Sequence, residues 1–343
     1  MAALTQAARV RVRAPLPGEG AAVASLWREL WDAHEQWGGY PGSRDPRVYA
    51  QLAARLDDDA RVRSGHPILG HHVHLVADLR GVPCGQVEGW FEHRGLPGLN
   101  APTCEVRSLI VTARARRLGA GRALLEAIAG AAREMARGAP TVLAAEVLDP
   151  NPARAFYARL GYSPVAWSAR IAAEHNVPRE STPFAARLAV SQDALALARL
   201  EATLAARRRA AGDLRFDRPH AIDATAVAAI AAHLAATAGA TDPVTLVAAD
   251  AAGVPRGAAT FNVQSLEPPF LPVRRALLGR FALDPAFAAA PLVAPMVALA
   301  RRLASARGAS HVEMTDLSAP GTDLYAAAIA AGAAPWSRVV IRG

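Results

Sequence analysis

The sequence predicts an α/β (α+β) chain in which one arrangement of strands and helices occurs twice. Short apolar runs of strand length alternate with amphipathic runs of helical period, and a helix follows each of the later strands. The same order of elements begins again in the second half, which indicates an internal duplication. The chain has 343 residues, of which 52% are hydrophobic, so it can bury a core in each of about two domains.

The first half begins with a short alternating strand, Arg9 to Arg13, and an amphipathic helix, Ala21 to Glu35. A second helix is expected over Arg47 to Leu56, ended by the acidic run Asp57-Asp58-Asp59. The same periodicities predict the remaining elements, which are a hairpin of His72 to Asp78 and Gly85 to Phe91, a strand Glu105 to Val111, a helix to about Arg137, a strand Thr141 to Leu148, a short helix Ala153 to Leu160 and a strand Val165 to Ile171.

A long helical run, Gln192 to Ala211, has the length and composition of a linker between two bodies. The pattern then begins again with strand Leu214 to Phe216, helix Ile222 to Ala238, strands Val244 to Ala249, Gly257 to Asn262 and Leu277 to Leu283, helix Leu292 to Arg307, strand His311 to Leu317, helix Thr322 to Ala331 and strand Val339 to Ile341. We therefore expect an N-terminal domain over 1–172, a linker with a helix over 173–212 and a C-terminal domain over 213–343.

Composition narrows the class of protein. The formal net charge of +8 comes from arginine alone, because the chain contains no lysine, and aromatic residues make up only 6%. The arginines are scattered along helix faces without an interleaved basic and aromatic stripe, so we expect no nucleic-acid partner. No membrane-spanning run and no signal-peptide core is found, which predicts a cytoplasmic protein. Two cysteines, Cys84 and Cys104, are too few for a disulfide framework or a zinc cluster.

A glycine-containing turn is the most informative feature of the first half. Arg116 to Gly121 follows the apolar run Leu109-Ile110-Val111 and precedes the helical run Ala123 to Ile128. A strand that leads through such a turn leaves unpaired N–H groups at a helix N-terminus, where anions bind. The turn lacks the Gly-Lys-Ser/Thr of a P-loop and the three glycines of a dinucleotide fingerprint. It predicts a cradle for a diphosphate; the alternative is a turn that binds nothing.

The duplication allows the two halves to be compared position by position. In the second half every polar feature singled out in the first is replaced, so we expect the first half to bind and react and the second to support it. Aligning Leu283 with Val111 places Leu277 opposite Glu105, Ala288 opposite Arg116, Pro291 opposite Gly119 and Val293 opposite Gly121. Aligning Gly332 with Gly161 places Ala328 opposite Tyr157.

Three motifs in this order resemble the GNAT superfamily of acyl-CoA-dependent N-acyltransferases. They are Leu109-Ile110-Val111, Arg116-x-x-Gly119-x-Gly121 and the run from Asn151 to Tyr162. The resemblance is close from Arg9 to about Ile171 and covers the second half only in architecture. It implies two tandem GNAT folds, each a mixed, mostly antiparallel splayed sheet flanked by helices, with a degenerate C-terminal repeat.

The resemblance also implies a site for acetyl-CoA as co-substrate between the strands at Glu105 to Val111 and Thr141 to Leu148. The first of these strands would pair with the pantetheine arm, the turn would bind the pyrophosphate, and two residues after the second strand would contact or flank the pantetheine. The cofactor-binding residues expected in this way are Leu109, Ile110, Val111, Arg116, Arg117, Leu118, Gly119, Ala120, Gly121, Arg122, Asn151 and Phe156.

Acetyl transfer from sulfur to an amine needs a base, because an alkyl ammonium has a pKa near 10 and its deprotonation at neutral pH costs roughly 4–5 kcal/mol. Glu105 occupies the position at which the family often carries a glutamate that acts directly or through water. Tyr157 matches the family's general acid, which protonates the departing thiolate. The alternatives are a surface glutamate at a strand edge and a half-buried tyrosine that only packs.

The family builds its acceptor pocket around the first helix. The acceptor contacts expected there and on the neighbouring strand are Trp31, His34, Glu35, Trp90 and Glu92. His71, His72 and His74 have no carboxylate or thiol among them, so we expect a structural or substrate-lining role and no metal.

The expected function is therefore an N-acetyltransferase that moves an acetyl group from acetyl-CoA to a small-molecule or peptide amine by direct attack. One alternative is a non-catalytic acyl-CoA-binding or scaffold protein. The other is a tandem acetyltransferase of the mycothiol-synthase type, which uses its C-terminal half for catalysis. The sequence leaves open the amine, the length of the acyl group, residual ligand binding in the second repeat, and whether the chain is a monomer (pseudo-dimer) or a homodimer.

Overall fold

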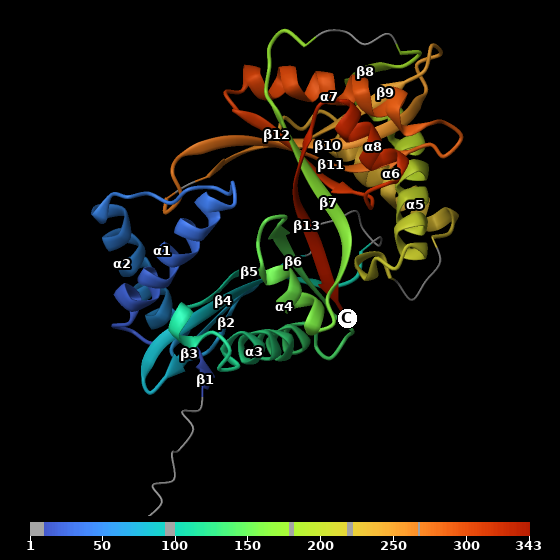
Figure 1. The fold of residues 1–343 in the computed structure, drawn as a ribbon. Coiled ribbons are helices and arrows are strands. Elements are labelled where there is room, and N and C mark those ends of the chain that lie inside the picture. Colours follow the sequence, from blue (N-terminus) through green and yellow to red (C-terminus); the bar gives the residue numbers. More distant parts are fainter. Residues whose placement is uncertain (1–9, 93–99, 178–181, 218–221, 267) are drawn as a thin grey trace, which may run out of the picture.

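A computed structural model describes residues 10–92, 100–177, 182–217, 222–266 and 268–343. Its described strands form one sheet of 13 strands, in the order β1-β3-β4-β5-β6-β13-β7-β12-β11-β10-β9-β8, with β2 paired to β3 (Figure 1). Helices pack against this sheet in both halves of the chain. The α/β (α+β) architecture of two tandem GNAT-like repeats is confirmed.

The first repeat carries two helices, α1 and α2, on one face of its strands and a third, α3, on the other. Its elements are β1 (Val10–Arg13), α1 (Gly20–Gln36), α2 (Pro46–Arg63), β2 (Ile68–Leu69), β3 (His72–Leu79), β4 (Val82–Glu92), β5 (Thr103–Val111), α3 (Ala120–Met135), β6 (Val142–Leu148), α4 (Ala153–Arg159) and β7 (Ser163–Ala172).

The second repeat has the same order of elements. They are β8 (Ala185–Leu188), α5 (Ala194–Ala210), α6 (Ala224–Thr237), β9 (Val244–Ala249), β10 (Pro255–Leu266), β11 (Val273–Leu283), α7 (Ala289–Ala306), β12 (His311–Leu317), α8 (Asp323–Ala330) and β13 (Ala334–Arg342), with short 3-10 turns at Ser191–Asp193 and Leu214–Phe216.

Apolar spacing explains the two layers of the first repeat. Leu124, Leu125 and Ile128 recur at helical spacing on α3 and are fully buried against the strands. On the opposite face, Trp27 and Trp31 of α1 pack with residues of α2 and with Ile110 of β5. The strands between these layers therefore have one side on α3 and the other side directed toward α1 and α2.

The last strands of the two repeats are exchanged. β13, from the second repeat, lies between β6 and β7 and pairs antiparallel with both. β7, from the first repeat, also pairs with β12 of the second. Val340 of β13 accordingly belongs to the apolar core of the first repeat. Figure 1 shows β7 and β13 running side by side through the middle of the molecule.

Three expectations about the elements are corrected. α2 does not end at Asp57 but continues to Arg63, because the acids have partners: Asp57 accepts from the N–H groups of Gly18 and Gly20, and Asp59 pairs with Arg63 at 2.6 Å. Residues 214–216 form a 3-10 turn and not a strand, since the Asp213 side chain caps the turn.

The expected linker helix is also part of the second repeat. α5 packs on α6, β10 and β11, and the strand before it, β8, pairs with β9. These two elements occupy the places of α1 and β1 in the first repeat. We therefore place the start of the second repeat at β8 and not at residue 213.

Candidate active site

The first repeat contains a splayed pair of strands. β5 and β6 run parallel and are paired only from Thr103 with Val142 to Val106 with Ala145. Beyond this point β5 continues to Val111 with its other edge paired to β4. Ser108, with φ 53°, forms an irregularity in that pairing where the strands separate. The edge of residues 107–111 that faces β6 therefore presents unpaired backbone groups, which an extended ligand can meet as an added strand.

The glycine turn lies directly beyond this edge. Gly119 is the N-cap of α3 and adopts φ +88°, and no side chain caps the helix. The first-turn N–H groups of Ala120, Gly121 and Arg122 have no intrahelical acceptor. Arg117 also has a positive φ of 68°. The turn therefore has the uncapped helix start that a diphosphate cradle needs.

The arginines of the turn differ in their surroundings. Arg116 donates to the Val111 carbonyl at 3.1 Å and to Glu29 of α1 at 3.2 Å, whereas Arg117 and Arg122 are exposed. Leu118 is 52% exposed at the tip. Two cations at the turn are thus available to an anion, and the third is shared with Glu29.

α4 packs against the start of α3. A Cβ on Gly121 would meet the Phe156 ring at 3.0 Å, so the glycine permits close contact between the two helices. Asn151 uses its Oδ1 to accept from the Ala153 N–H at 2.9 Å, which leaves its amide N–H₂ for a ligand. Phe156 thereby lies beside the turn, as expected of a residue that flanks the pantetheine.

Tyr157 lies in the core of the first repeat. It packs edge-to-face against Phe156 and Tyr162, and burial raises the pKa of its phenol well above the usual value. The phenol therefore keeps its proton at neutral pH, as a general acid requires.

Glu105 lies on the face of the sheet that is directed away from α3. Arg107 donates two hydrogen bonds to its Oε2, one of them at 3.1 Å, and Oε1 has no partner among the described residues. In the antiparallel register Glu105 is opposite Trp90, and Arg107 is opposite Glu88. These four side chains therefore form one patch.

Two carboxylates that the sequence did not single out are Glu88, which belongs to this patch, and Glu146, which lies near it. Glu88 accepts from the Ser108 hydroxyl at 3.1 Å. Glu146, two residues beyond the Glu105 partner Ala144, accepts from Ser337 of β13 at 2.5 Å. Solvent reaches Glu146, but the protein around it displaces enough water to raise the pKa of its carboxyl. A lone acid in the apolar run Val142 to Leu148 was the sequence signal for Glu146.

The histidines of β3 are held by neighbours. Arg63 donates from Nη2 to His72 Nδ1 at 2.7 Å, so the single proton of this imidazole is on Nε2, which lies 3.7 Å from Glu88. Burial and the charge of Arg63 lower the pKa of His72 to about 3. His74 is buried beside Asp59 and Gln86, and His71 lies on the opposite face. Among the described residues no group of three acidic, Cys or His side chains is placed to hold a metal ion.

The residues expected at the acceptor pocket have different surroundings in the structure, and not all of them line a cavity. Trp90 is stacked on His72, with ring centres 4.2 Å apart, and lines a cavity. Trp31 is corrected to a core residue, since only 1% of it is exposed and three aromatic rings surround it. Glu35 is exposed and paired with Arg44, and His34 packs near Trp37. Glu92 ends β4, and its side chain lies outside the described residues.

The second repeat has a similar splayed pair but a different loop. β11 and β12 are paired only from Ala276 to Leu278, and Arg280 has the positive φ that Ser108 has in β5. The loop before α7 spans residues 284–288, whereas the loop before α3 spans 112–119. It is therefore three residues shorter. The expected register is corrected: Ala288, as N-cap, stands opposite Gly119 and not opposite Arg116.

In the second repeat, arginine side chains of the protein itself form hydrogen bonds with Asp316 near the end of β12. The Asp316 carbonyl accepts from Arg208 of α5, and the Asp316 carboxylate accepts from Arg215 at 3.1 Å. The loop that corresponds to the cradle, residues 284–288, contains no arginine, and its Asp284 pairs with Arg256 at 3.3 Å. Ala328 on α8 is fully buried opposite Tyr157. The second repeat therefore lacks the arginine-containing turn and the tyrosine of the first, although the start of α7 also has no side-chain cap.

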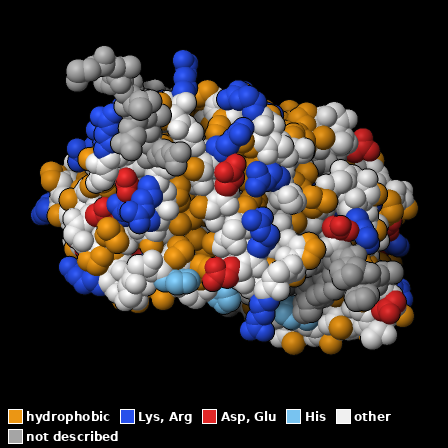
Figure 2. Space-filling view, turned by 90° about the horizontal axis from the view of Figure 1, so that it is seen from below, with side chains coloured by type: hydrophobic (Ala, Val, Ile, Leu, Met, Phe, Trp, Pro, Cys, Tyr) orange, Lys and Arg blue, Asp and Glu red, His pale blue; other side chains and the backbone are white. Residues whose placement is uncertain are grey.

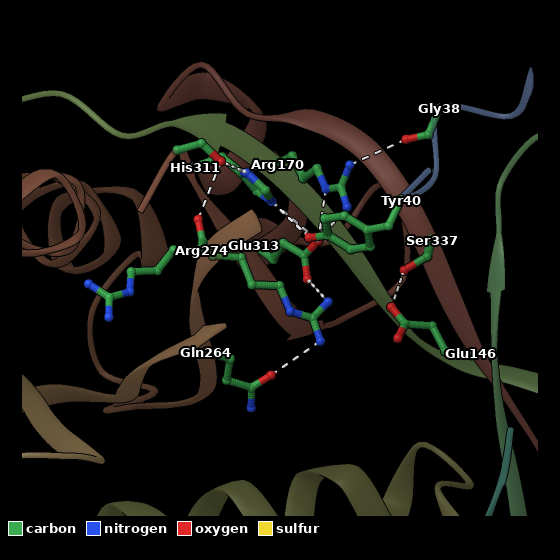
Figure 3. A network of polar contacts seen from close by, with 11 residues as sticks. Gly38, Tyr40, Glu146, Arg170, Gln264, Arg274, His311, Glu313 and Ser337 are labelled. Atoms are coloured by element: carbon green, nitrogen blue, oxygen red, sulfur yellow. Dashed lines mark hydrogen bonds and ion pairs between the residues drawn. The ribbon is translucent and has the colours of Figure 1, made fainter. Parts of the chain in front are cut away.

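The two repeats are also joined by a buried polar cluster (Figure 3). Glu313 of β12 is 4% exposed and pairs with Arg170 of β7 at 2.6 Å and with Arg275 of β11 at 2.9 Å. Tyr40, in the loop after α1, donates to Glu313 and contacts His311 Nε2 at 2.8 Å. Burial alone would raise the pKa of Glu313, but the hydrogen bond with His311 and the charges of the two arginines lower it to about 2, so the carboxylate stays ionised.

Figure 2 shows arginine side chains dispersed among acidic and apolar ones on the face seen from below. In the described part of the chain, no helix has the length and apolar character needed to cross a membrane.

Comparison with known proteins agrees with this geometry. Residues 24–162 match the model of the acetyltransferase (GNAT) family. No sequence among the curated proteins matches the chain. A GCN5-related N-acetyltransferase from Sphaerobacter thermophilus is 15% identical, with 97% of this chain and 95% of that chain covered and a TM-score of 0.59.

A second solved structure contains a GCN5-related glucosamine N-acetyltransferase region of a fungal multi-domain β-N-acetylglucosaminidase. It is 14% identical, with 98% of this chain and 38% of that chain covered and a TM-score of 0.58. At these identities the two structures show the fold alone. The family match covers the splayed strands, the turn and α4 of the first repeat, so this part of the chain is similar to GNAT acetyltransferases, and the two structures show that the whole chain has a GNAT-like fold.

Proposed function

We propose that this protein is an N-acetyltransferase that moves an acetyl group from acetyl-CoA to a primary amine by direct attack, with catalysis in the first repeat. The observation that supports this most is the continuity of the unpaired β5 edge with the uncapped start of α3. Pantetheine fits the first as an added strand, and the diphosphate fits the second. The thioester then lies where β5 and β6 separate, between Glu105 and α4.

In the proposed reaction the amine nitrogen attacks the thioester carbonyl carbon. Glu105, directly or through water, accepts a proton from the attacking amine at its free Oε1. The developing oxyanion accepts a hydrogen bond from a backbone N–H of the Leu109 to Val111 strand. As the carbon–sulfur bond breaks, Tyr157 donates its proton to the CoA thiolate. Arg107 pairs with Glu105 and orients its carboxylate.

A thiol-release assay with acetyl-CoA and a panel of amines tests this proposal. We expect Tyr157→Phe and Glu105→Gln each to lower kcat about 10²-fold or more, with the Kd for acetyl-CoA unchanged. Tyr162→Phe is a matched control, because it removes a neighbouring buried hydroxyl that has no partner. Glu146→Gln tests whether the carboxylate on β6, near the point where β5 and β6 separate, acts as the base instead.

Three outcomes would contradict the assignments. Normal turnover by Tyr157→Phe would remove this residue as the acid. A larger loss in Glu146→Gln than in Glu105→Gln would move the role of base to β6. Tight binding of acetyl-CoA without thiol release for any amine would favour a non-catalytic acyl-CoA-binding protein.

A further inference from the structure

A cavity of about 480 Å³ lies between the two repeats, on the same side of the sheet as Glu105. The first repeat contributes one wall from α1, α2, β3 and β4, and the second repeat contributes the other from the turn between β10 and β11. This volume is that of a small-molecule site. The residues that matter here are Trp27, His72, Glu88 and Trp90 from the first repeat and Ser265 and Phe270 from the second.

The wall from the second repeat is fixed in place. The Ser43 N–H donates to the Pro269 carbonyl at 2.8 Å, and the Leu271 N–H donates to the Pro41 carbonyl at 3.0 Å. The Phe270 ring packs against Trp31, with centres 5.7 Å apart. Figure 1 shows the β10–β11 hairpin reaching from the second repeat to α1 and α2. A wall held in this way limits the size of an acceptor and does not simply border an open surface.

Among the described residues that line the cavity, Glu88 is a carboxylate without a charged partner. The Glu88 side chain is only 16% exposed and contacts the Ser108 hydroxyl and, at 3.7 Å, His72. His72 is neutral, because Arg63 occupies its Nδ1. Asp59, the other acid of the cavity, is already paired with Arg63. A half-buried carboxylate lacking a counter-charge is costly, so a cation is the complementary ligand.

The remaining lining favours an apolar body behind that cation. Trp27, Trp90 and Phe270 present aromatic rings, and rings attract ammonium groups as well as apolar groups. Arg55, a cation among the described lining residues, is exposed on α2, where water screens its charge. Ser108, the hydroxyl partner of Glu88, marks the point at which β5 leaves β6. The cavity therefore opens beside the expected position of the thioester.

We propose that this cavity is the acceptor site, that Glu88 binds the ammonium of a small primary amine with an apolar body, and that the β10–β11 turn of the second repeat forms the outer wall of the site. This inference rests on the proposed N-acetyltransferase function. It assigns the second repeat a direct part in acceptor selection, although that repeat has lost its own cradle. It also disfavours folded-protein acceptors, whose lysines would have to pass the fixed wall.

Equilibrium binding and turnover test the inference separately. The probe is 2-phenylethylamine, with 2-phenylethanol as its uncharged analogue, titrated into the full chain in the presence of CoA and followed by tryptophan fluorescence. We expect the amine to bind and the alcohol to bind at least tenfold more weakly. Glu88→Gln should weaken amine binding at least tenfold and leave acetyl-CoA binding unchanged. Ser265→Trp, which fills the cavity from the second repeat, should have the same effect.

Leu271→Trp is the matched control, because Leu271 lies on the same turn but is 42% exposed and does not line the cavity. It should bind the amine as the native protein does. Absence of amine binding, or equal binding by native protein, Glu88→Gln and Ser265→Trp, would overturn the inference. Amine binding with these mutational effects but without thiol release would support the cavity and contradict the proposed function. Thiol release with the same KM for the amine in native protein, Glu88→Gln and Ser265→Trp would support the proposed function and contradict the cavity as the acceptor site.

Discussion

His72 shows how a single side chain in the cavity is kept in one protonation state by its neighbours. An arginine cannot accept a hydrogen bond, so the 2.7 Å contact from Arg63 forces His72 Nδ1 to be the unprotonated nitrogen. A second proton would have to enter at that nitrogen, against burial and the arginine charge. The cavity therefore gains no positive charge from this histidine at neutral pH, and Glu88 keeps its affinity for a cation.

The same arrangement makes the free energy of unfolding depend on pH. Histidine in the unfolded chain binds a proton near pH 6.5, whereas folded His72 does so only near pH 3. Between these values the unfolded chain binds more protons, so this contribution to stability is complete above pH 6.5 and is lost as the pH falls toward 3. We expect the native protein to lose about 1–2 kcal/mol more than His72→Asn between pH 7.5 and 5, at about 1.4 kcal/mol per unit.

Thermal or urea unfolding at the two pH values measures this difference. Asparagine can still accept a hydrogen bond from Arg63 but does not titrate. His233→Asn, on the exposed side of α6, is the control for loss of a histidine. Equal acid losses in the native protein and His72→Asn would show that another group is responsible.

At the scale of elements, the two turns that lead into α3 and α7 allow a direct comparison. Gly121 and Ala290 each stand two residues after the N-cap of their helix. Only the first helix follows the longer loop with two positive φ residues, Arg117 and Gly119. If the α3 turn binds the diphosphate, a side chain at Gly121 should obstruct it, whereas one at Ala290 should not matter.

We expect Gly121→Val to raise the Kd for acetyl-CoA at least tenfold, since the added side chain would contact Phe156 and cover the first-turn N–H groups. Ala290→Val should leave this Kd unchanged. Isothermal titration of both variants provides the measurement, and circular dichroism checks that both are folded. Equal weakening by the two substitutions would contradict binding in the first repeat alone.

Local periodicity was enough to predict most strands, α1, α3, the glycine turn before α3 and the duplication, because these features depend on residues close in sequence. Local periodicity failed where contacts between residues far apart in the sequence determine the structure. The apolar-looking run Leu214 to Phe216 became a 3-10 turn through the Asp213 cap. Glu88 and Phe270 share a cavity although they are far apart in the chain. No local sequence pattern indicates that these residues lie close together. The sequence therefore predicted that Trp90 lines the acceptor pocket but did not single out Glu88.

At the scale of the whole molecule, the exchanged strands make the two repeats one folding unit. β13 closes the sheet of the first repeat, and Val340 fills a place in the first core. β7 in turn borders β12. A substitution that reduces packing in one repeat should therefore lower the stability of both repeats.

We expect Val340→Ala, in the first core, and Val297→Ala, in the core of the second repeat, each to cost about 1–3 kcal/mol. Both should lower the midpoint of the same single unfolding transition. Differential scanning calorimetry and hydrogen exchange of β6 amides measure this coupling. Two separate transitions, with each substitution shifting only one, would contradict a single cooperative unit.

The position of β13 has a consequence for biosynthesis. This strand emerges from the ribosome after the other described elements of the second repeat, yet it pairs with β6 of the first. A nascent chain that has translated only the first repeat therefore lacks part of its central sheet. If the proposed site between β5 and β6 is the catalytic one, its sheet is closed only after the second repeat has been translated.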